Sequence, residues 1–173
     1  MNNYDVDNVS GQVFYKLGHL TEAVQGNTYG PWDTETFEVE DSAMGFIKMK
    51  NGALINLRTS WALNIMEARE ASTTLCGTLE GAEIKHGGSY EKSELWFNHV
   101  RHGKMTHETL SGEALVDYFE GINDPPGVVE AKQWINAVNN NISPVVKPEE
   151  AFRVTEILDA IYKAAATNTT IKF

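Results

Sequence analysis

Two extended runs rich in apolar residues, Ser42–Lys50 and Ala53–Ala62, lie on either side of Asn51-Gly52, and the second alternates between an apolar and a mostly polar face. Because this residue pair favours a two-residue type I′ turn, the segment is predicted to form a β-hairpin. One face of the second run is apolar and carries Ala53, Ile55, Leu57, Thr59 and Trp61. The opposite face is mostly polar, a pattern typical of an antiparallel sheet that is packed on one side only.

Other extended segments flank this hairpin. A long polar and aromatic loop, Gly18–Phe37, separates it from a first predicted strand, Val9–Leu17. Loops longer than ~12–15 residues in a compact domain usually serve a function or are disordered. Four further strands are predicted after the hairpin, the last two joined at His102-Gly103: Ser72–Thr78, Ala82–His86, Glu94–Val100 and Met105–Leu110.

The period changes to that of a helix in the last third of the chain. Val128–Asn139 and a segment starting at Pro148 have helical spacing, and Asn168 is a suitable C-terminal cap before a short strand, Thr170–Phe173. The buried stripe predicted for the last helix is Ala151, Val154, Leu158, Ile161, Tyr162 and Ala165. The prediction is an α+β fold: an open, mostly antiparallel sheet with helices packed on one face.

Composition narrows the class of protein. The chain has 173 residues, of which 42% are hydrophobic, and its formal net charge is −10. This is the size and composition of one globular domain, and the negative charge disfavours nucleic acid and anionic membranes as partners. The single cysteine, Cys76, favours a reducing compartment. With no signal peptide and no run of ~20 apolar residues, we expect a cytoplasmic protein.

Most motifs for catalysis or cofactor binding are missing from the sequence. Neither G-x-G-x-x-G nor G-x-x-x-x-G-K-[ST] occurs, so this chain alone is not expected to bind a dinucleotide. His99, His102 and His107 could ligate a metal, but their spacing fits no familiar zinc pattern and favours a solvated hairpin. Cys76 has no neighbouring base to activate it and is interpreted as a small core residue.

Aromatic residues are the most informative candidates for a binding site. Trp32 lies in the long loop between Tyr29 and Phe37, and Trp61 ends a predicted strand just before Asn64. Flat rings near amide and carboxylate groups, here Asn64 and Asp33, suit a sugar or polyol. The alternative is that Trp61 fills the core and Trp32 fixes the loop.

Several stretches in order along the chain together resemble a known domain. They are Val39-Glu40-Asp41-Ser42-Ala43, Lys50-Asn51-Gly52-Ala53, Thr59-Ser60-Trp61-Ala62, Thr74-Leu75-Cys76-Gly77-Thr78, Val146-Lys147-Pro148-Glu149-Glu150-Ala151 and Ile157-Leu158-Asp159-Ala160-Ile161-Tyr162. The set resembles the C-terminal domain of the Gfo/Idh/MocA oxidoreductases, the glucose–fructose oxidoreductase and inositol dehydrogenase family.

The resemblance implies a Rossmann domain for NAD or NADP, followed by a domain that shapes the substrate pocket and oligomerises through its sheet. Reactions in the family are mainly hydride transfers on sugars and cyclitols. The family's cofactor loop and its Glu-Lys-Pro motif with the catalytic lysine lie upstream of the matched region and do not occur here. Residues 1–173 are therefore predicted to be a single C-terminal domain that lacks the dinucleotide-binding domain, and Met1 is compatible with an internal residue of a longer enzyme.

Two hypotheses follow from these features. In the first, the chain is the substrate-binding and oligomerisation domain of an NAD(P)-dependent sugar or polyol oxidoreductase, inactive alone, without bound cofactor or metal, and a dimer or tetramer. Its substrate-contact residues would be Trp61, Asn64 and Trp32, and it would hold no catalytic residue. In the second, it is a stand-alone, non-enzymatic module that binds carbohydrate or dimerises.

Overall fold

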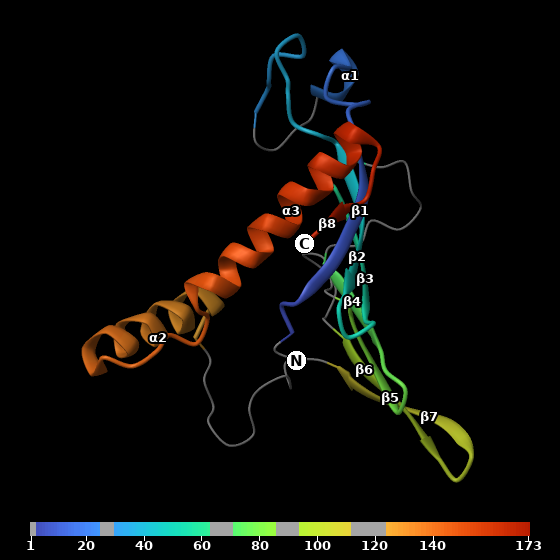
Figure 1. The fold of residues 1–173 in the computed structure, drawn as a ribbon, viewed down its shortest axis with the longest axis vertical. Coiled ribbons are helices and arrows are strands. Elements are labelled where there is room, and N and C mark those ends of the chain that lie inside the picture. The colour runs from blue at the N-terminus through green and yellow to red at the C-terminus, as the bar shows by residue number, and fades with distance from the viewer. Residues whose placement is uncertain (1–2, 25–29, 63–70, 86–93, 112–123) are drawn as a thin grey trace. The chain divides into compact units, whose positions relative to one another are not determined.

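Antiparallel strands and helices make up the regular structure of the chain, a computed structural model that describes residues 3–24, 30–62, 71–85, 94–111 and 124–173. The strands form two four-stranded sheets, in the orders β3-β2-β1-β8 and β4-β5-β6-β7 (Figure 1). The predicted α+β class is confirmed. The strands that were expected to continue the sheet of the hairpin, from Ser72 onward, form a second, separate sheet. The chain divides into two units, Met1–Asn64 with Gln133–Phe173 and Ile65–Lys132, and each is described by itself.

The first sheet brings both ends of the chain together. Its strands are β1 (Val6–Phe14), β2 (Ser42–Met49), β3 (Leu54–Ser60) and β8 (Ile171–Lys172). The register pairs Val9 with Ile47 on β2 and with Ile171 on β8. Central pairs of β-branched residues suit a pleated surface that is buried on one face. β1 begins three residues earlier than predicted and ends before Leu17, because the backbone there turns to meet Asp41.

The turn between β2 and β3 has three residues and not the predicted two. Met49 N–H donates to Ala53 O at 2.8 Å, and Gly52 N–H donates to Met49 O at 2.9 Å. Gly52 has a φ of 91°, whereas Asn51 lacks the positive φ that a type I′ turn requires. Asn51 instead accepts the Ala53 N–H with its side-chain Oδ1 at 3.0 Å, so its amide stabilises the longer loop.

Helix α3 (Pro148–Thr167) packs on one face of the first sheet through its second half (Figure 1). The core there consists of Val6, Val9, Ile47, Met49, Ala160 and Ile161. Ile161 lies over Gly11 and Gly45, where a Cβ would approach its side chain to 2.8 Å and 2.7 Å. Small residues on both elements therefore let the helix lie close to the strands.

The predicted stripe of α3 is only partly correct. Ile161 is buried, but Val154, Leu158 and Tyr162 are 50%, 44% and 42% exposed. The face that packs holds Ile157, Ala160, Ile161 and Ala164, because a close approach to the sheet glycines needs alanines at the contact. The ends of α3 are as predicted: Lys147 N–H donates to Glu150 Oε2 at 2.9 Å, and Asn168 caps it with φ 51° and ψ 40°.

The second sheet is a meander of β4 (Ser72–Cys76), β5 (Glu80–Lys85), β6 (Glu94–Arg101) and β7 (Lys104–Ser111). β6 and β7 are joined at His102-Gly103, as predicted. Both turn residues have positive φ, 52° and 73°, so the type I′ geometry expected after β2 occurs here instead.

Helix α2 (Pro126–Asn140) starts two residues before its predicted start and exposes Val128, Ile135 and Val138.

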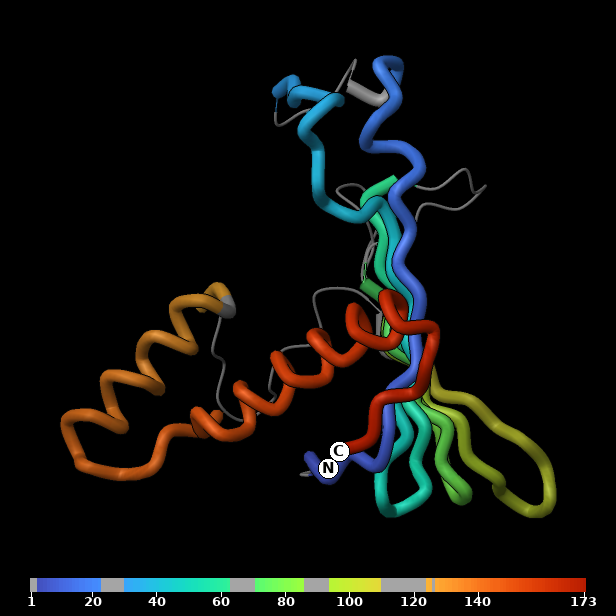
Figure 2. Tube along the Cα trace, turned by 45° about the horizontal axis from the view of Figure 1, so that its top comes forward, coloured from blue at the N-terminus to red at the C-terminus, as the bar shows by residue number. Residues whose placement is uncertain are grey.

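The segment between β1 and β2 projects past the strand ends of the first unit in both views (Figure 1, Figure 2). Its described residues include a short helix, α1 (Thr21–Val24), which the sequence did not predict. Contacts within the loop close it on itself. Trp32 Nε1–H donates to Gly18 O at 2.8 Å, and His19 Nδ1 lies 2.8 Å from Thr34 O.

Candidate functional site

Three aromatic rings meet where β1 ends, β2 begins and β3 ends. The ring centroids of Trp32 and Phe37 lie 5.2 Å apart, those of Trp32 and Trp61 lie 5.5 Å apart, and those of Phe37 and Trp61 lie 5.8 Å apart. Two of the three contacts are edge-to-face, a geometry that stabilises an aromatic pair by about 0.5–1.5 kcal/mol beyond area burial. We call these residues the aromatic cluster.

Backbone carbonyls hold both indoles of the aromatic cluster. Trp61 Nε1–H donates to Glu40 O at 2.8 Å, as Trp32 Nε1–H does to Gly18 O. The indole donors are therefore already paired, and the ring faces are the surfaces that remain for a ligand. Trp61 is 46% exposed. The alternative interpretation of the tryptophans is therefore correct for Trp32, which fixes the loop, and wrong for Trp61, which does not fill the core.

A buried carboxylate, Asp41, fixes the backbone around the cluster. Its residue is 3% exposed, and its Oδ2 accepts the N–H groups of Lys16 and Leu17. Its main-chain O accepts Trp61 N–H at 3.2 Å and Ser60 Oγ–H at 2.9 Å. Because a buried acceptor that lost these donors would cost about 1–3 kcal/mol, Asp41 ties three strand ends into one frame.

Glu40 joins the cluster to α3. Tyr162 O–H donates to Glu40 Oε1 at 2.5 Å. The hydrogen bond to the carboxylate raises the pKa of Tyr162 to about 12, with burial as a smaller cause. The phenol therefore stays protonated, and remains a donor, at neutral pH.

The residues that the sequence proposed for substrate contact have different outcomes. The structure brings Trp61 and Trp32 together, while Asn64 and Tyr29 lie outside the described residues. Asp33 is turned to its own loop, because its carboxylate accepts Glu35 N–H at 3.0 Å and Thr36 Oγ1–H at 3.1 Å. The sequence analysis missed Glu40 and Tyr162, whose contact spans 122 residues and leaves no local signal.

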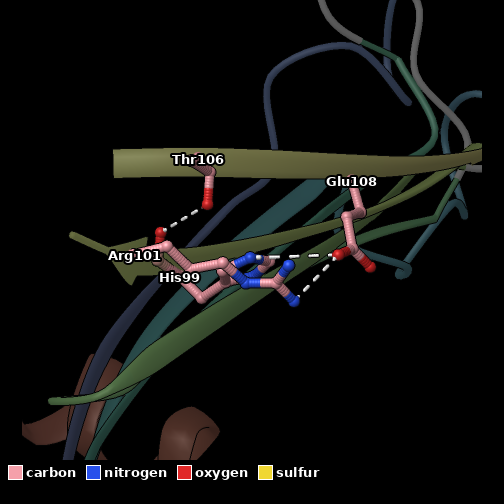
Figure 3. Close-up of polar contacts among 4 residues, drawn as sticks. All are labelled: His99, Arg101, Thr106 and Glu108. Carbon is pink, nitrogen blue, oxygen red and sulfur yellow. Dashed lines mark hydrogen bonds and ion pairs between the residues drawn. The ribbon is translucent and has the colours of Figure 1, made fainter. Parts of the chain in front are cut away.

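The histidines of the second sheet do not converge. The register pairs His99 with Thr106 and Asn98 with His107, so His99 and His107 project from opposite faces of the sheet. Figure 3 shows Glu108 facing His99 and Arg101: Glu108 Oε1 lies 3.9 Å from His99 Nε2 and 3.3 Å from Arg101 Nη2. Across the residues described, no group of three or more His, Cys, Asp or Glu side chains is placed to hold a metal ion.

Two other features bear on function. Cys76 is exposed on β4, so its interpretation as a core residue was wrong; all residues of this short strand are exposed, and the strand has no buried face to receive the side chain. Within the described part of the chain, no helix combines the length and apolar character needed to span a membrane.

The long helices offer no site for the phosphates of a dinucleotide. α3 begins with Pro148 and has Glu149 and Glu150 in its first turn, charges that repel an anion at the helix N-terminus. α2 follows Asp124 and Pro125 and not a glycine-rich loop. In the part of the chain that the structure describes, the residues at the start of either long helix therefore do not fit the phosphates of a dinucleotide.

Comparisons with known proteins agree with the fold. D-glucoside 3-dehydrogenase of Escherichia coli (strain K12) is 27% identical over 167 residues, which cover 96% of this chain and 42% of that protein. Apo levoglucosan dehydrogenase matches with a TM-score of 0.67 at 17% identity, covering 97% of this chain and 46% of that one. Aldose-aldose oxidoreductase from Caulobacter crescentus, complexed with glycerol, matches with a TM-score of 0.64 at 16% identity, covering 98% and 42%.

Other structures of the same fold contain cofactor and sugar. Levoglucosan dehydrogenase in complex with NADH and L-sorbose matches with a TM-score of 0.61 at 18% identity, covering 97% of this chain and 45% of that one. This chain thus spans less than half the length of these proteins. The model of the oxidoreductase family's C-terminal alpha/beta domain matches residues 11–173. The chain belongs to the Gfo/Idh/MocA oxidoreductase family and corresponds to its C-terminal domain.

Proposed function

We propose that the chain is the substrate-binding domain of an NAD(P)-dependent oxidoreductase that acts on a sugar, polyol or related hydroxyl or carbonyl compound. The observation that carries this proposal is the aromatic cluster, in which Trp61 is half-exposed and its N–H is already bonded. Apolar C–H faces of a sugar stack on such rings. The C-terminal alpha/beta domain of the family supplies the oxidoreductase context.

The chain alone is proposed to bind substrate without catalysis. The described starts of its long helices do not fit a dinucleotide, and we assign no proton-transfer residue to it. NAD or NADP would be held by a part of the protein that this chain does not include. Binding energy gathered at the aromatic cluster would orient the sugar and exclude water.

Calorimetric titration with L-sorbose and with glycerol tests this role. Trp61→Ala should weaken binding by about tenfold, because it removes the exposed ring. Trp134→Ala is the matched control, since Trp134 is 57% exposed on α2 and makes no ring contact among the described residues. Equal losses in both variants, or no binding to the unmodified chain, would contradict the proposal. Sugar binding that is complete without NAD(P) and independent of any preceding domain would favour the stand-alone module.

We also propose that the protein is a homo-oligomer, a dimer or tetramer, formed through the first sheet. The face away from α3 exposes Met44, Phe46 and Leu54, at 41%, 48% and 63%. Their cross-strand neighbours on this face are Arg58, Asn56 and Lys48, and a surface that mixes apolar and polar side chains in this way is typical of protein–protein interfaces. Light scattering should show an oligomer that Phe46→Glu dissociates; a strict monomer at micromolar concentration contradicts the proposal.

A cytoplasmic location is also proposed. It fits Cys76, the only cysteine, which cannot form a disulfide within the chain.

A further inference from the structure

The carboxylate of Glu40 uses only part of its hydrogen-bonding capacity. Its Oε1 accepts Tyr162 O–H at 2.5 Å, and within the described part of the chain Oε2 makes no hydrogen bond or ion pair. An ionised carboxylate has about four acceptor positions, so most of them are open to a ligand. The main-chain O of the same residue accepts Trp61 Nε1–H at 2.8 Å. An acceptor for hydroxyl groups and a ring for stacking are therefore anchored on one residue.

Two tyrosines lie on the same face of the first sheet as this carboxylate. Tyr162 is 42% exposed, and its hydroxyl still offers a lone pair to a ligand while it donates to Glu40. Tyr15 is 44% exposed and follows β1, where the alternation that turns Val13 toward α3 also places Tyr15 on that face. Tyr15 is near enough to contribute to the raised pKa of Tyr162. The phenols and the carboxylate thus form an exposed polar group.

The charge around this polar group is negative. Residues 31–40 contain no lysine or arginine and include four carboxylates: Asp33, Glu35, Glu38 and Glu40. Lys163 follows Tyr162 but pairs with Asp159 at 2.5 Å, and Arg58 lies opposite Met44 on the face away from α3. Lys16 follows Tyr15 and makes no ion pair among the described residues, so its contribution needs a test of its own.

A ligand hydroxyl and a ligand carboxylate interact with Glu40 in opposite ways. A hydroxyl can donate to it, and hydrogen bonds to an ionised group are among the stronger ones. A ligand carboxylate has no proton to donate at neutral pH and is repelled. Two like charges about 4 Å apart near a protein surface weaken binding by about tenfold or more. The aromatic rings do not make this distinction, because both kinds of ligand offer C–H faces for stacking.

We propose that Glu40 is the specificity-determining residue of the candidate site, and that the site takes uncharged sugars or polyols and excludes sugar acids. Glu40 accepts ligand hydroxyls through Oε2, and Tyr162 and Tyr15 contact neighbouring hydroxyls. The Trp61 ring carries the C–H face of the ligand. This selection rests on the proposed function, because it needs a sugar bound at Trp61.

Calorimetric titration of the chain with L-sorbose and with gluconate, a sugar acid of similar size, tests this selection. The unmodified chain should bind L-sorbose about tenfold more tightly or better, and the ratio of the two affinities should fall as salt is added, because salt screens exposed charges. The salt series tests the charge argument without any variant. Tyr162→Phe removes one hydrogen-bonding group and should weaken L-sorbose by about 2- to 10-fold, with the salt dependence of the ratio unchanged.

Glu40→Gln and Glu38→Gln form a matched pair of variants. Glu40→Gln keeps an acceptor oxygen for Tyr162 but removes the charge, so the ratio should fall to about twofold or less and lose its salt dependence. Glu38→Gln removes the same charge from the same loop, at an exposed side chain that makes no hydrogen bond among the described residues. It should leave most of the ratio in place.

Three results would overturn the inference while the proposed function stands. They are equal affinities of the unmodified chain for the two ligands, an equal fall of the ratio in Glu38→Gln and Glu40→Gln, and tight gluconate binding that Lys16→Gln abolishes. An unchanged affinity for L-sorbose in Tyr162→Phe would contradict the contact assigned to Tyr162. If the unmodified chain binds no L-sorbose, the proposed function fails and the selection fails with it.

Discussion

The contact between α3 and the first sheet predicts a steric defect together with its rescue. An alanine Cβ at residue 45 would lie 2.7 Å from Ile161 Cδ1 and 3.0 Å from its Cγ1. Gly45→Ala therefore overpacks the core. Ile161→Val removes Cδ1, the atom nearest to the new methyl group, and leaves the rest of the β-branched side chain in place. The double variant should therefore lose the closest contact of Gly45→Ala, and the Cγ1 that valine retains, at 3.0 Å, has only to shift slightly.

The expected magnitudes separate rescue from simple addition. Overpacking by one methyl group costs about 1–3 kcal/mol, and Ile→Val in a core costs about 0.5–1.5 kcal/mol. If the two sites were independent, the double variant would lose the sum of these two costs in its free energy of unfolding. Relief of the clash should instead leave the double variant about 1–2 kcal/mol more stable than that sum predicts. A domain of this size has about 5–15 kcal/mol of stability, so each variant should remain folded.

Urea unfolding followed by circular dichroism measures this coupling, and Gly11→Ala supplies the control. A Cβ at residue 11 would lie 2.7 Å from Met44 O and 2.8 Å from Ile161 Cγ2. Valine retains Cγ2, and Met44 O is backbone, so Ile161→Val should not rescue Gly11→Ala. Strict additivity of Gly45→Ala with Ile161→Val, or equal rescue at both glycines, would refute the packing argument.

Three further predictions concern single polar groups. Asp41→Asn should lower the free energy of unfolding by about 1–3 kcal/mol in urea, because an amide cannot accept two backbone donors as well as a carboxylate does; no loss would argue against its role as a frame. Lys48 Nζ lies 3.0 Å from Asp7 Oδ2 and lowers the pKa of the Asp7 carboxyl below 3.8 in the folded state. The ion pair therefore stabilises the folded state above pH 3.8, and this contribution is lost as the pH falls through the lowered pKa of the folded protein. An NMR titration of Lys48→Gln should show the Asp7 pKa moving back toward 3.8, and an unmoved pKa would contradict this. Asn168→Gly should leave thermal stability nearly unchanged, while Asn168→Val should cost about 1–2 kcal/mol at a φ of 51°, and equal melting temperatures would show that the cap does not matter.

The sequence predicted the antiparallel strands and both longer helices, because their hydrophobic periods are local. It was less reliable where two elements meet. The stripe of α3 was placed on its largest apolar residues, yet the packed face uses Ala160 and Ala164, since Gly11 and Gly45 admit a close helix. Which face of a helix packs depends on the surface opposite, and that surface comes from strands more than 100 residues away in sequence.

In the candidate site, too, local features could be predicted and contacts between distant elements could not. Trp32 and Trp61 could be selected from residue type and position, and the structure places their rings 5.5 Å apart. Glu40 and Tyr162 could not be selected. Tyr162 was assigned to the buried stripe by its helical spacing, whereas its hydroxyl is used at the edge of the sheet. A hydrogen bond across 122 residues depends on the assembled fold and not on a local pattern.

The hydrogen bonds of the aromatic cluster limit how it would recognise the sugar that we propose as its ligand. Both indole N–H groups are committed to backbone carbonyls, and Asp33 is committed to its own loop. The rings can therefore supply stacking area, but stacking alone discriminates poorly between sugars, because hydroxyl recognition needs donors and acceptors aimed at each oxygen. In the part of the chain that the structure describes, the Glu40 carboxylate is hydrogen-bonded through Oε1, which leaves Oε2 for such a contact. Different residues should thus control affinity and selectivity. Trp61→Ala should weaken the binding of L-sorbose and of glycerol by the same factor, while Glu40→Gln should change the ratio of their two affinities.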